Sequence, residues 1–445
     1  MQNWLGQSAA DLGRGIGAGE IDPVALTEAF LTAAGNHALS DRIYARLTPE
    51  RALAEAEAAA ERARLGLRRS LLDGVPISWK DLFDSTNVAT EAGSKLLRGR
   101  VPESDAVVLR NATEAGLICL GKTHMSELAF SGLGYNPSTA TPPCVNDVEA
   151  VPGGSSSGAA ASIAFDIAPA AIGSDTGGSV RIPAAWNDLV GLKTTTGRLS
   201  LEGCVPLCLK FDTVGPLART VEDAALLLGV LEGKRPPDLR GAGLKGRRLA
   251  ALQTVVLDDI CDEPLAAYNA ALEKLRDAGA EIEEIAVPEL AGDDGAMALT
   301  GPLYTGEAYG LWRDVIEADP DAMFAEVRER FRQGRKFTAA DYTSAWSRLE
   351  AARQAWDGRV AGFDAVVCPT ASILPPNLER LKADHDYYVT ENLLALRNTR
   401  VGNLMGLCAL TLPTGVPSCG LMMFGAPDTE GHLLRLGAAV EIALA

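Results

Sequence analysis

Residues 151–184 limit what this chain can fold into more than any other segment. Their sequence, VPGGSSSGAAASIAFDIAPAAIGSDTGGSVRIPA, places two loops rich in glycine and serine, GGSSSG and GSDTGGS, around a run of small and apolar residues. Glycine permits backbone conformations that other residues avoid and lets N–H groups approach a ligand closely. Several N–H groups directed at one point form an anion-binding site. A serine at the end of such a loop can act as a nucleophile whose negative intermediate is stabilised.

Two common motifs match the sequence but lack their structural context. Residues 116–123, GLICLGKT, fit the phosphate-loop pattern, yet the four residues between the glycines favour a strand rather than a turn. Residues 154–158, GSSSG, fit the nucleophile elbow of α/β-hydrolases, but a polar segment precedes them where a buried strand is required. The downstream histidines, His385 and His432, lie in polar contexts. We therefore expect neither a nucleotide-binding loop nor an α/β-hydrolase.

The composition sets the broad class of protein. With 445 residues, of which 47% are hydrophobic, the chain can bury a large core. No apolar run of about eighteen residues predicts a membrane span, and the N-terminus lacks the features of a secretion signal. The net charge of −17 argues against a nucleic-acid surface, and the eight scattered cysteines form no zinc-binding pattern. We expect a cytoplasmic protein without metal, membrane or nucleic-acid partners.

Alternating strand-like and helix-like segments indicate an α/β fold. The segments expected to form strands are residues 75–80, 117–120, 167–172, 189–193, 248–253, 281–287, 364–368, 409–412 and 420–424. The segments expected to form helices are residues 20–33, 48–65, 105–115, 157–164, 220–231, 263–278, 320–334 and 339–356. Asp22 and Thr220 stand where they can cap two of these helices.

Three segments, in this order, resemble the amidase signature family. They are residues 74–81 (GVPISWKD), residues 153–156 (GGSS) and residues 173–183 (GSDTGGSVRIP). Residues 121–123 and 412–415 resemble further landmarks of the family. The resemblance implies the family's fold, a central mixed β-sheet sandwiched by α-helices.

The resemblance also suggests how the chain is organised. We expect a single amidase domain over residues 1–445. Within it, residues 1–70 would form a solvent-facing helical arm packed on the core, and residues 71–232 would form the catalytic core. Residues 233–445, where the resemblance is thin, would complete the sheet and the pocket.

Carried over to this sequence, the resemblance implies a catalytic triad of Lys80, Ser155 and Ser179. Ser179 would attack the carbonyl carbon, and Ser155, which follows a cis peptide bond near Gly154, would pass the proton to Lys80. None of the four histidines lies in a catalytic context, which favours lysine as the base. Because free lysine titrates near 10.4, Lys80 must be made neutral by burial. Backbone N–H groups expected to bind the oxyanion belong to Thr176, Gly177, Gly178 and Ser179. Three residues are expected to support the loops: Ser156, Asp175 and Arg181.

The substrate pocket is less determined by the sequence. Residues named as candidates for its walls are Met125, Phe130, Leu133, Trp186 and the segment 303–312. Arg397 or Arg400 could bind a substrate carboxylate, although the sequence favours surface ion pairs for both. We expect His124 to have a structural role, and a position at the edge of the pocket is the alternative. We expect residues 135–151 to form a surface loop.

The sequence thus predicts an enzyme without cofactor that hydrolyses a small-molecule carboxamide to a carboxylate and ammonia or an amine. Two alternatives stay open: an A-type subunit of a glutamyl-tRNA amidotransferase, and a catalytically silent binding homologue. Intact lysine and serine positions argue against the silent homologue. Aliphatic, aryl, urea-type and half-amide substrates, esterase side activity and a homodimer all remain open.

Overall fold

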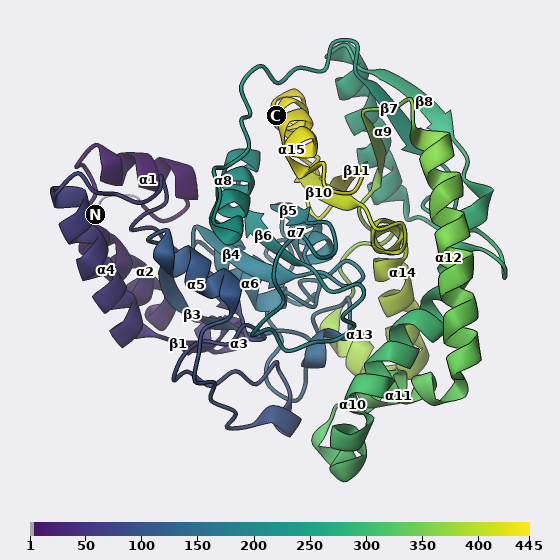
Figure 1. The fold of residues 1–445 in the computed structure, drawn as a ribbon, viewed down its shortest axis with the longest axis horizontal. Helices are drawn as coiled ribbons and strands as arrows, with labels where there is room; N and C mark the ends of the chain where they lie inside the picture. The colour runs from purple at the N-terminus through teal and green to yellow at the C-terminus, as the bar shows by residue number, and fades with distance from the viewer. Residues whose placement is uncertain (1–3) are drawn as a thin grey trace.

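Within residues 4–445, which the computed structural model describes, an 11-stranded mixed β-sheet runs through the molecule (Figure 1). The strands are β1 (Tyr44–Leu47), β2 (Pro76–Lys80), β3 (Ile118–Thr123), β4 (Ala170–Ser174), β5 (Val190–Lys193), β6 (Val214–Ala218), β7 (Arg248–Leu252), β8 (Glu281–Ile285), β9 (Ala365–Pro369), β10 (Cys408–Pro413) and β11 (Gly420–Gly425). Their order across the sheet is β1-β3-β2-β4-β6-β5-β10-β11-β9-β7-β8. All predicted strands are present, with ends displaced by a few residues, and the predicted central mixed sheet is confirmed.

Fifteen α-helices accompany the sheet in the described part of the chain. They are α1 (Ala9–Gly17), α2 (Pro23–Asn36), α3 (Ser40–Ile43), α4 (Pro49–Arg64), α5 (Val107–Glu114), α6 (Ser157–Ala164), α7 (Arg181–Trp186), α8 (Val221–Glu232), α9 (Asp262–Asp277), α10 (Gly306–Ala318), α11 (Ala325–Arg332), α12 (Ala339–Val360), α13 (Leu378–Ala383), α14 (His385–Leu404) and α15 (Glu430–Leu444). Among residues 4–445, none of these helices has the length and apolar character needed to cross a membrane.

Helices cover both faces of the sheet, as strand β10 demonstrates. Successive side chains of a strand point to opposite faces. Leu410 packs against Gly437 of α15, whereas its neighbour Thr411 lies on the side of Ala184 and Ala185 in α7. Helices α15 and α7 therefore lie on opposite faces, which gives the sandwich that the resemblance implied.

Local sequence explains where several helices begin. The side chain of Asp22 accepts a hydrogen bond from the backbone N–H of Ala25, and Thr220 caps α8 in the same way. The expected helix over residues 320–334 is shorter than predicted. Pro320 starts a separate 3₁₀ turn, and α11 begins only at Ala325.

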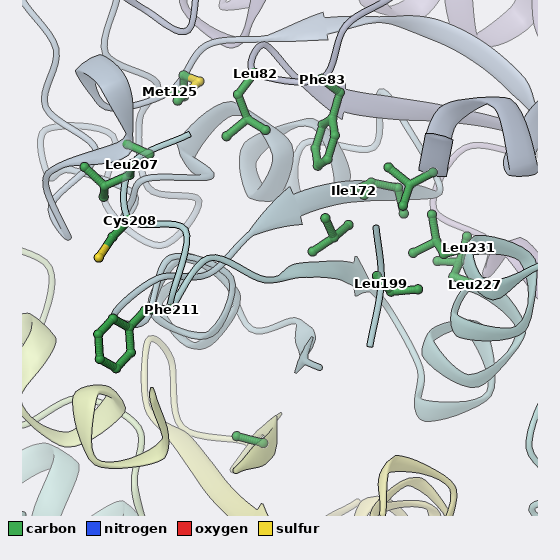
Figure 2. Packing of buried hydrophobic residues seen from close by; sticks show 14 of the residues in the cluster. Leu82, Phe83, Met125, Ile172, Leu199, Leu207, Cys208, Phe211, Leu227 and Leu231 are labelled. Atoms are coloured by element: carbon green, nitrogen blue, oxygen red, sulfur yellow. The ribbon is translucent and has the colours of Figure 1, made fainter. Parts of the chain in front are cut away.

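The N-terminal helices contribute to the hydrophobic core. Leu12 of α1 and Phe30 of α2 are fully buried, so this region is more deeply integrated than a solvent-facing arm. The helices α1, α2 and α4 lie at one end of the molecule, far from α12 (Figure 1). Further along the same core, Phe83 after β2 and Ile172 of β4 belong to one cluster with Leu227 of α8 (Figure 2).

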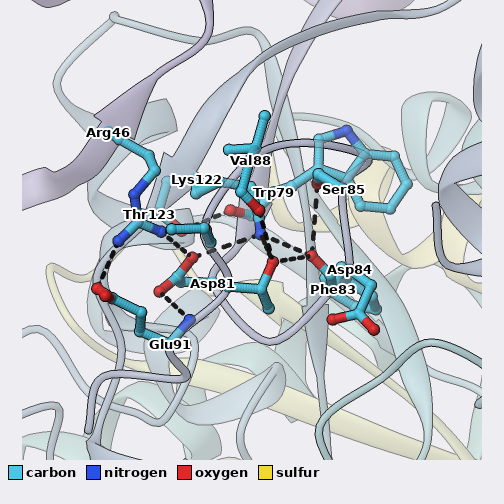
Figure 3. Close-up of polar contacts among 12 residues, drawn as sticks. Arg46, Trp79, Asp81, Phe83, Asp84, Ser85, Val88, Glu91, Lys122 and Thr123 are labelled. Carbon is cyan, nitrogen blue, oxygen red and sulfur yellow. Dashed lines mark hydrogen bonds and ion pairs between the residues drawn. The ribbon is translucent and has the colours of Figure 1, made fainter. Parts of the chain in front are cut away.

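The segment that matched the phosphate-loop pattern is part of a buried strand. Lys122 lies in β3, and its Nζ donates to the carbonyl oxygen of Phe83 at 2.6 Å (Figure 3). It also donates to Thr90 Oγ1 at 2.9 Å. Its ion pair with Asp81 measures 3.4 Å, and Asp81 is also paired with Arg46. Lys122 is thus a structural lysine, and the exclusion of a nucleotide loop is supported.

Residues 135–151 are irregular, as predicted, but only part of this segment lies at the surface. Asn136 and Cys144 are buried. The Asn136 amide donates to the carbonyl oxygens of Gly93 and Met125, both at 2.8 Å. These bonds fasten the first part of the segment to the core, so the expectation of a surface loop is wrong for its buried positions.

Candidate active site

Two parallel strands bring the central lysine and a serine to the same edge of the sheet. Lys80 ends β2 and Ser174 ends β4, and these strands are neighbours. Because the carboxyl ends of parallel strands meet at one edge, the two side chains lie together. Lys80 Nζ donates to Ser174 Oγ at 2.8 Å and to Ser155 Oγ at 2.7 Å. The contact between Lys80 and Ser155 was expected, whereas Ser174 was not named.

The first glycine- and serine-rich loop delivers Ser155 to this lysine. The peptide bond between Gly154 and Ser155 is cis, at the position that was expected. A Cβ atom at Gly154 would stand 2.5 Å from both Gly134 N and Ser126 Oγ, so only glycine fits there. Ser156 Oγ donates to the carbonyl oxygen of Ser174 at 3.2 Å, which ties this loop to β4.

A buried ion pair shapes the second loop. Asp175 and Arg181 are fully buried and joined by two hydrogen bonds of 3.0 Å. Asp175 also accepts hydrogen bonds from the backbone N–H groups of Gly178 (2.8 Å) and Val180 (3.2 Å) and from the Asn403 amide (2.9 Å). Burial alone would raise the pKa of Asp175, but Arg181 holds it well below its usual value. The geometry fits the supporting role predicted for both residues.

The backbone of the second loop offers N–H groups to a ligand. The Gly178 N–H is already bound by Asp175. Within residues 4–445, the N–H groups of Thr176, Gly177 and Ser179 have no hydrogen-bond partner, and all three residues line a cavity. Of the four predicted oxyanion donors, three are therefore free in this structure.

Ser179 stands where the two loops meet. The backbone N–H of Ser156 donates to its carbonyl oxygen at 3.2 Å. In the described part of the chain, no group forms a hydrogen bond with the Ser179 hydroxyl, and the residue lines the cavity with 3% of its surface exposed. A serine that is buried to this extent yet faces a cavity is well placed to meet a bound molecule.

Burial controls the charge of Lys80. It lowers the pKa of the amine to about 7, against the opposing effect of Asp175 and Asp212. Asp212 itself has a pKa raised to about 6 by burial, and it accepts a hydrogen bond of 2.5 Å from the Thr176 hydroxyl. Near neutral pH a large share of Lys80 is therefore uncharged and able to accept a proton.

The cavity at Ser179 has a volume of about 430 Å³. It is lined by Ala129, Phe130, Ser131, Thr176, Gly177, Ser179, Leu207, Thr300, Gly301, Tyr304, Thr305, Glu326, Glu329, Arg330, Gln333, His385, Tyr388, Val389, Asn392, Leu393, Leu396 and Arg400. Helix α14 supplies the largest share of this wall, and a π-helical turn over Gly301–Thr305 closes another side. π-Helical turns are frequent at functional sites.

Among the four pocket candidates named from the sequence, only Phe130 lines the cavity. Met125 lies in the main hydrophobic cluster, as Figure 2 shows. Leu133 and Trp186 pack together in a second cluster, where Trp186 Nε1 donates to the carbonyl oxygen of Ile373. These three assignments are wrong because apolar residues close in sequence to the motifs fill the core behind the loops.

Three other expectations have mixed outcomes. In the segment 303–312, Tyr304 and Thr305 line the cavity, but Trp312 instead donates to the carbonyl oxygen of Pro206. His124 lies outside the cavity lining, and burial lowers its pKa to about 4, as suits a structural histidine. Arg400 is 9% exposed and, within residues 4–445, forms no ion pair, so the favoured surface pairing is wrong for it.

The comparison with protein families shows to which family this chain belongs. The family model described as Amidase matches residues 25–434. The chain belongs to the amidase family. This assignment makes it an enzyme of the class that hydrolyses the carbon–nitrogen bond of amides.

Individual relatives of this amidase-family chain cover nearly its whole length. The A-type subunit of the glutamyl-tRNA(Gln) amidotransferase from Anaeromyxobacter dehalogenans (strain 2CP-C) is 34% identical over 97% of this chain and 95% of the relative. A 2-amino-5-chloromuconic acid deaminase from Comamonas testosteroni is 34% identical over 95% of this chain and 93% of the relative. Among solved structures, an amidase is 32% identical with a TM-score of 0.87, covering 99% of this chain and 100% of that one. The peptide amidase from Stenotrophomonas maltophilia is 28% identical with a TM-score of 0.79, and the match covers 98% of this chain and 96% of the peptide amidase.

Several residues of this amidase-family site were missed by sequence reasoning. They are Ser174, Asp212, Arg330, Tyr388 and Asn392. Ser174 immediately precedes Asp175 and could have been predicted as a site residue. The residue that ends a buried parallel strand faces the same edge of the sheet as Lys80. No motif marks the others, since they come from segments distant in sequence.

Proposed function

We propose that this amidase-family protein hydrolyses small-molecule carboxamides, with Ser179 as nucleophile, Ser155 as proton bridge and Lys80 as base. The observation that carries the proposal is the 2.7 Å hydrogen bond between Lys80 Nζ and Ser155 Oγ, together with a cavity that Ser179 lines. The product is a carboxylate with ammonia or an amine.

The reaction proceeds in two halves. The Ser179 oxygen bonds to the amide carbon while its proton passes through Ser155 to neutral Lys80. The negative oxygen is stabilised by the free N–H groups of Thr176, Gly177 and Ser179, each contributing about 3 kcal/mol. The proton returns through Ser155 to the leaving nitrogen as the carbon–nitrogen bond breaks. Water then attacks the acyl-enzyme by the same proton path, releasing the carboxylate.

The pH dependence of hydrolysis tests the role of Lys80. Since only neutral Lys80 accepts a proton and its pKa lies at about 7, kcat/KM is expected to rise with pH and level off above that value. On the acid side it should fall about tenfold per pH unit. Ammonia release from a panel of primary amides, measured between pH 4 and pH 9, checks this. An acid limb at pH 4–5, where carboxylates titrate, would contradict the assignment of Lys80 as base.

A second candidate function is an A-type subunit of a glutamyl-tRNA amidotransferase, because such a protein from Anaeromyxobacter dehalogenans is 34% identical over nearly all of this chain. The two candidates are separated by purification from the native host. A free-standing amidase releases ammonia from small amides without further chains, whereas an amidotransferase subunit co-purifies with partner chains and needs them for full activity.

A further inference from the structure

Arg400 carries a buried positive charge that nothing in the described chain neutralises. It lies on α14 with 9% of its surface exposed and lines the cavity at Ser179. Within residues 4–445 its guanidinium forms neither a hydrogen bond nor an ion pair. A buried charge without a partner is costly, so a guanidinium in this position implies an anion that arrives from outside the chain.

The two glutamates of the cavity wall form ion pairs with residues other than Arg400. Glu326 pairs with His385 at 2.7 Å. Glu329 pairs with Arg328 and Arg332, both at 3.0 Å. These two carboxylates therefore have other partners, and the wall leaves the charge of Arg400 uncompensated.

A second guanidinium adds to the positive charge of the same cavity. Arg330 of α11 donates from Nη1 to the carbonyl oxygen of Phe130 at 2.9 Å and lies over the Phe130 ring at 4.3 Å. These contacts fix its orientation and leave further N–H groups free. Burial, with the nearby charge of Arg400, lowers the pKa of Arg330 to about 9, so it stays charged at neutral pH.

A tyrosine hydroxyl in the cavity wall is also unpartnered. Tyr304 stacks on Phe211 with ring centroids 4.4 Å apart, which fixes the direction of its side chain. Its hydroxyl is buried and, in the described part of the chain, has no hydrogen-bond partner. It lies close enough to Arg400 for the two groups to influence each other's pKa. Unpaired buried hydroxyls are disfavoured, so a bound acceptor would satisfy both groups.

Arg400 lies beside the loop that holds the reactive serine. A Cβ atom placed on Gly177 would be 3.9 Å from Arg400 Nε. Gly177 offers one of the free N–H groups assigned to the oxyanion. An anionic group bound to Arg400 would therefore be only a few bonds from a carbonyl group bound at that loop.

We propose that the substrate carries a carboxylate a few bonds from its amide, as in the half-amide of a short dicarboxylic acid, and that Arg400 binds this carboxylate with Arg330 and Tyr304 alongside. A planar carboxylate matches the donor geometry of guanidinium groups. This inference rests on the proposed amide hydrolysis and specifies its substrate class.

The test compares each half-amide with its uncharged diamide. The series is malonamate, succinamate and glutaramate, with malonamide, succinamide and glutaramide as neutral counterparts. The wild type should prefer at least one half-amide in kcat/KM. Arg400→Met should reduce that preference about 100-fold, as expected when one partner of a buried charged pair is removed. Arg397→Met is the matched control, since Arg397 is on the same helix outside the cavity lining, and it should leave the preference unchanged.

Binding to an inactive variant separates this inference from the proposed function. Calorimetry with Ser179→Ala should detect the preferred half-amide and not its diamide, and adding Arg400→Met should abolish that binding. The inference is overturned if no half-amide binds better than its diamide, or if Arg400→Met weakens both equally, as it would if Arg400 acted only on the oxyanion. If half-amides bind through Arg400 but none is hydrolysed by the wild type, the proposed hydrolysis fails while the carboxylate site stands.

Discussion

Ser179→Ala is expected to lower kcat/KM for amide hydrolysis by about 10⁵-fold, as loss of a serine nucleophile does in other hydrolases. The alanine cannot bond to the amide carbon, so no acyl-enzyme forms and only stabilisation by the loop N–H groups remains. Substrate affinity should change little, because Ser179 contributes only a small part of the cavity wall. Steady-state ammonia release, combined with calorimetric binding of the same amide, measures both quantities.

The control for this variant is Ser200→Ala. Ser200 is exposed and outside the cavity lining, so its loss should leave kcat/KM unchanged. Ammonia release by Ser179→Ala within tenfold of the wild type would show that another group is the nucleophile.

Lys80→Met is expected to lower kcat by about 10⁴-fold, because it removes the base while nearly preserving side-chain volume. Methionine cannot accept the proton that Ser155 passes on, and the hydrogen bonds from Nζ to Ser155 and Ser174 disappear. The residual activity should also lose its titration near pH 7. Rates measured across pH 5–9 on equal amounts of folded protein test both effects.

Lys122→Met is the matched control, because Lys122 is also buried and lies on the neighbouring strand. Its removal takes away an ion-pair partner of buried Asp81 and should lower the free energy of unfolding by about 3 kcal/mol. The folded fraction should keep its activity and its pH profile. If Lys80→Met and Lys122→Met instead reduced activity to the same extent, Lys80 would have a structural rather than a chemical role.

The catalytic loops were predictable because their chemistry is local. Helix α6 begins and ends where its run of small residues predicts, at Ser157 and Ala164. The position of Lys80 at the end of an apolar strand explains both its burial and its lowered pKa. Glycine at position 154 is enforced by the backbone of Gly134 across the site.

The pocket could not be predicted because its wall comes from distant segments. Helix α14 was missed, since it buries polar residues such as Asn392, Asn398 and Thr399 and so lacks an apolar stripe of helical period. Arg330 and Arg400 lie on separate helices, and only the folded chain brings both to one cavity. Charged residues are ordinarily solvated, so neither side chain was expected to line an internal cavity.

The most direct test of the account is to capture the acyl-enzyme. A reaction quenched with acid during turnover of an amide substrate is analysed by intact-protein mass spectrometry and peptide mapping. We expect the wild-type protein to gain the mass of the acyl group, and we expect this mass to lie on the peptide containing Ser179. We expect no such gain in Ser179→Ala. An acyl group on any other residue, or acylation of Ser179→Ala to the same extent as the wild type, would contradict Ser179 as the nucleophile.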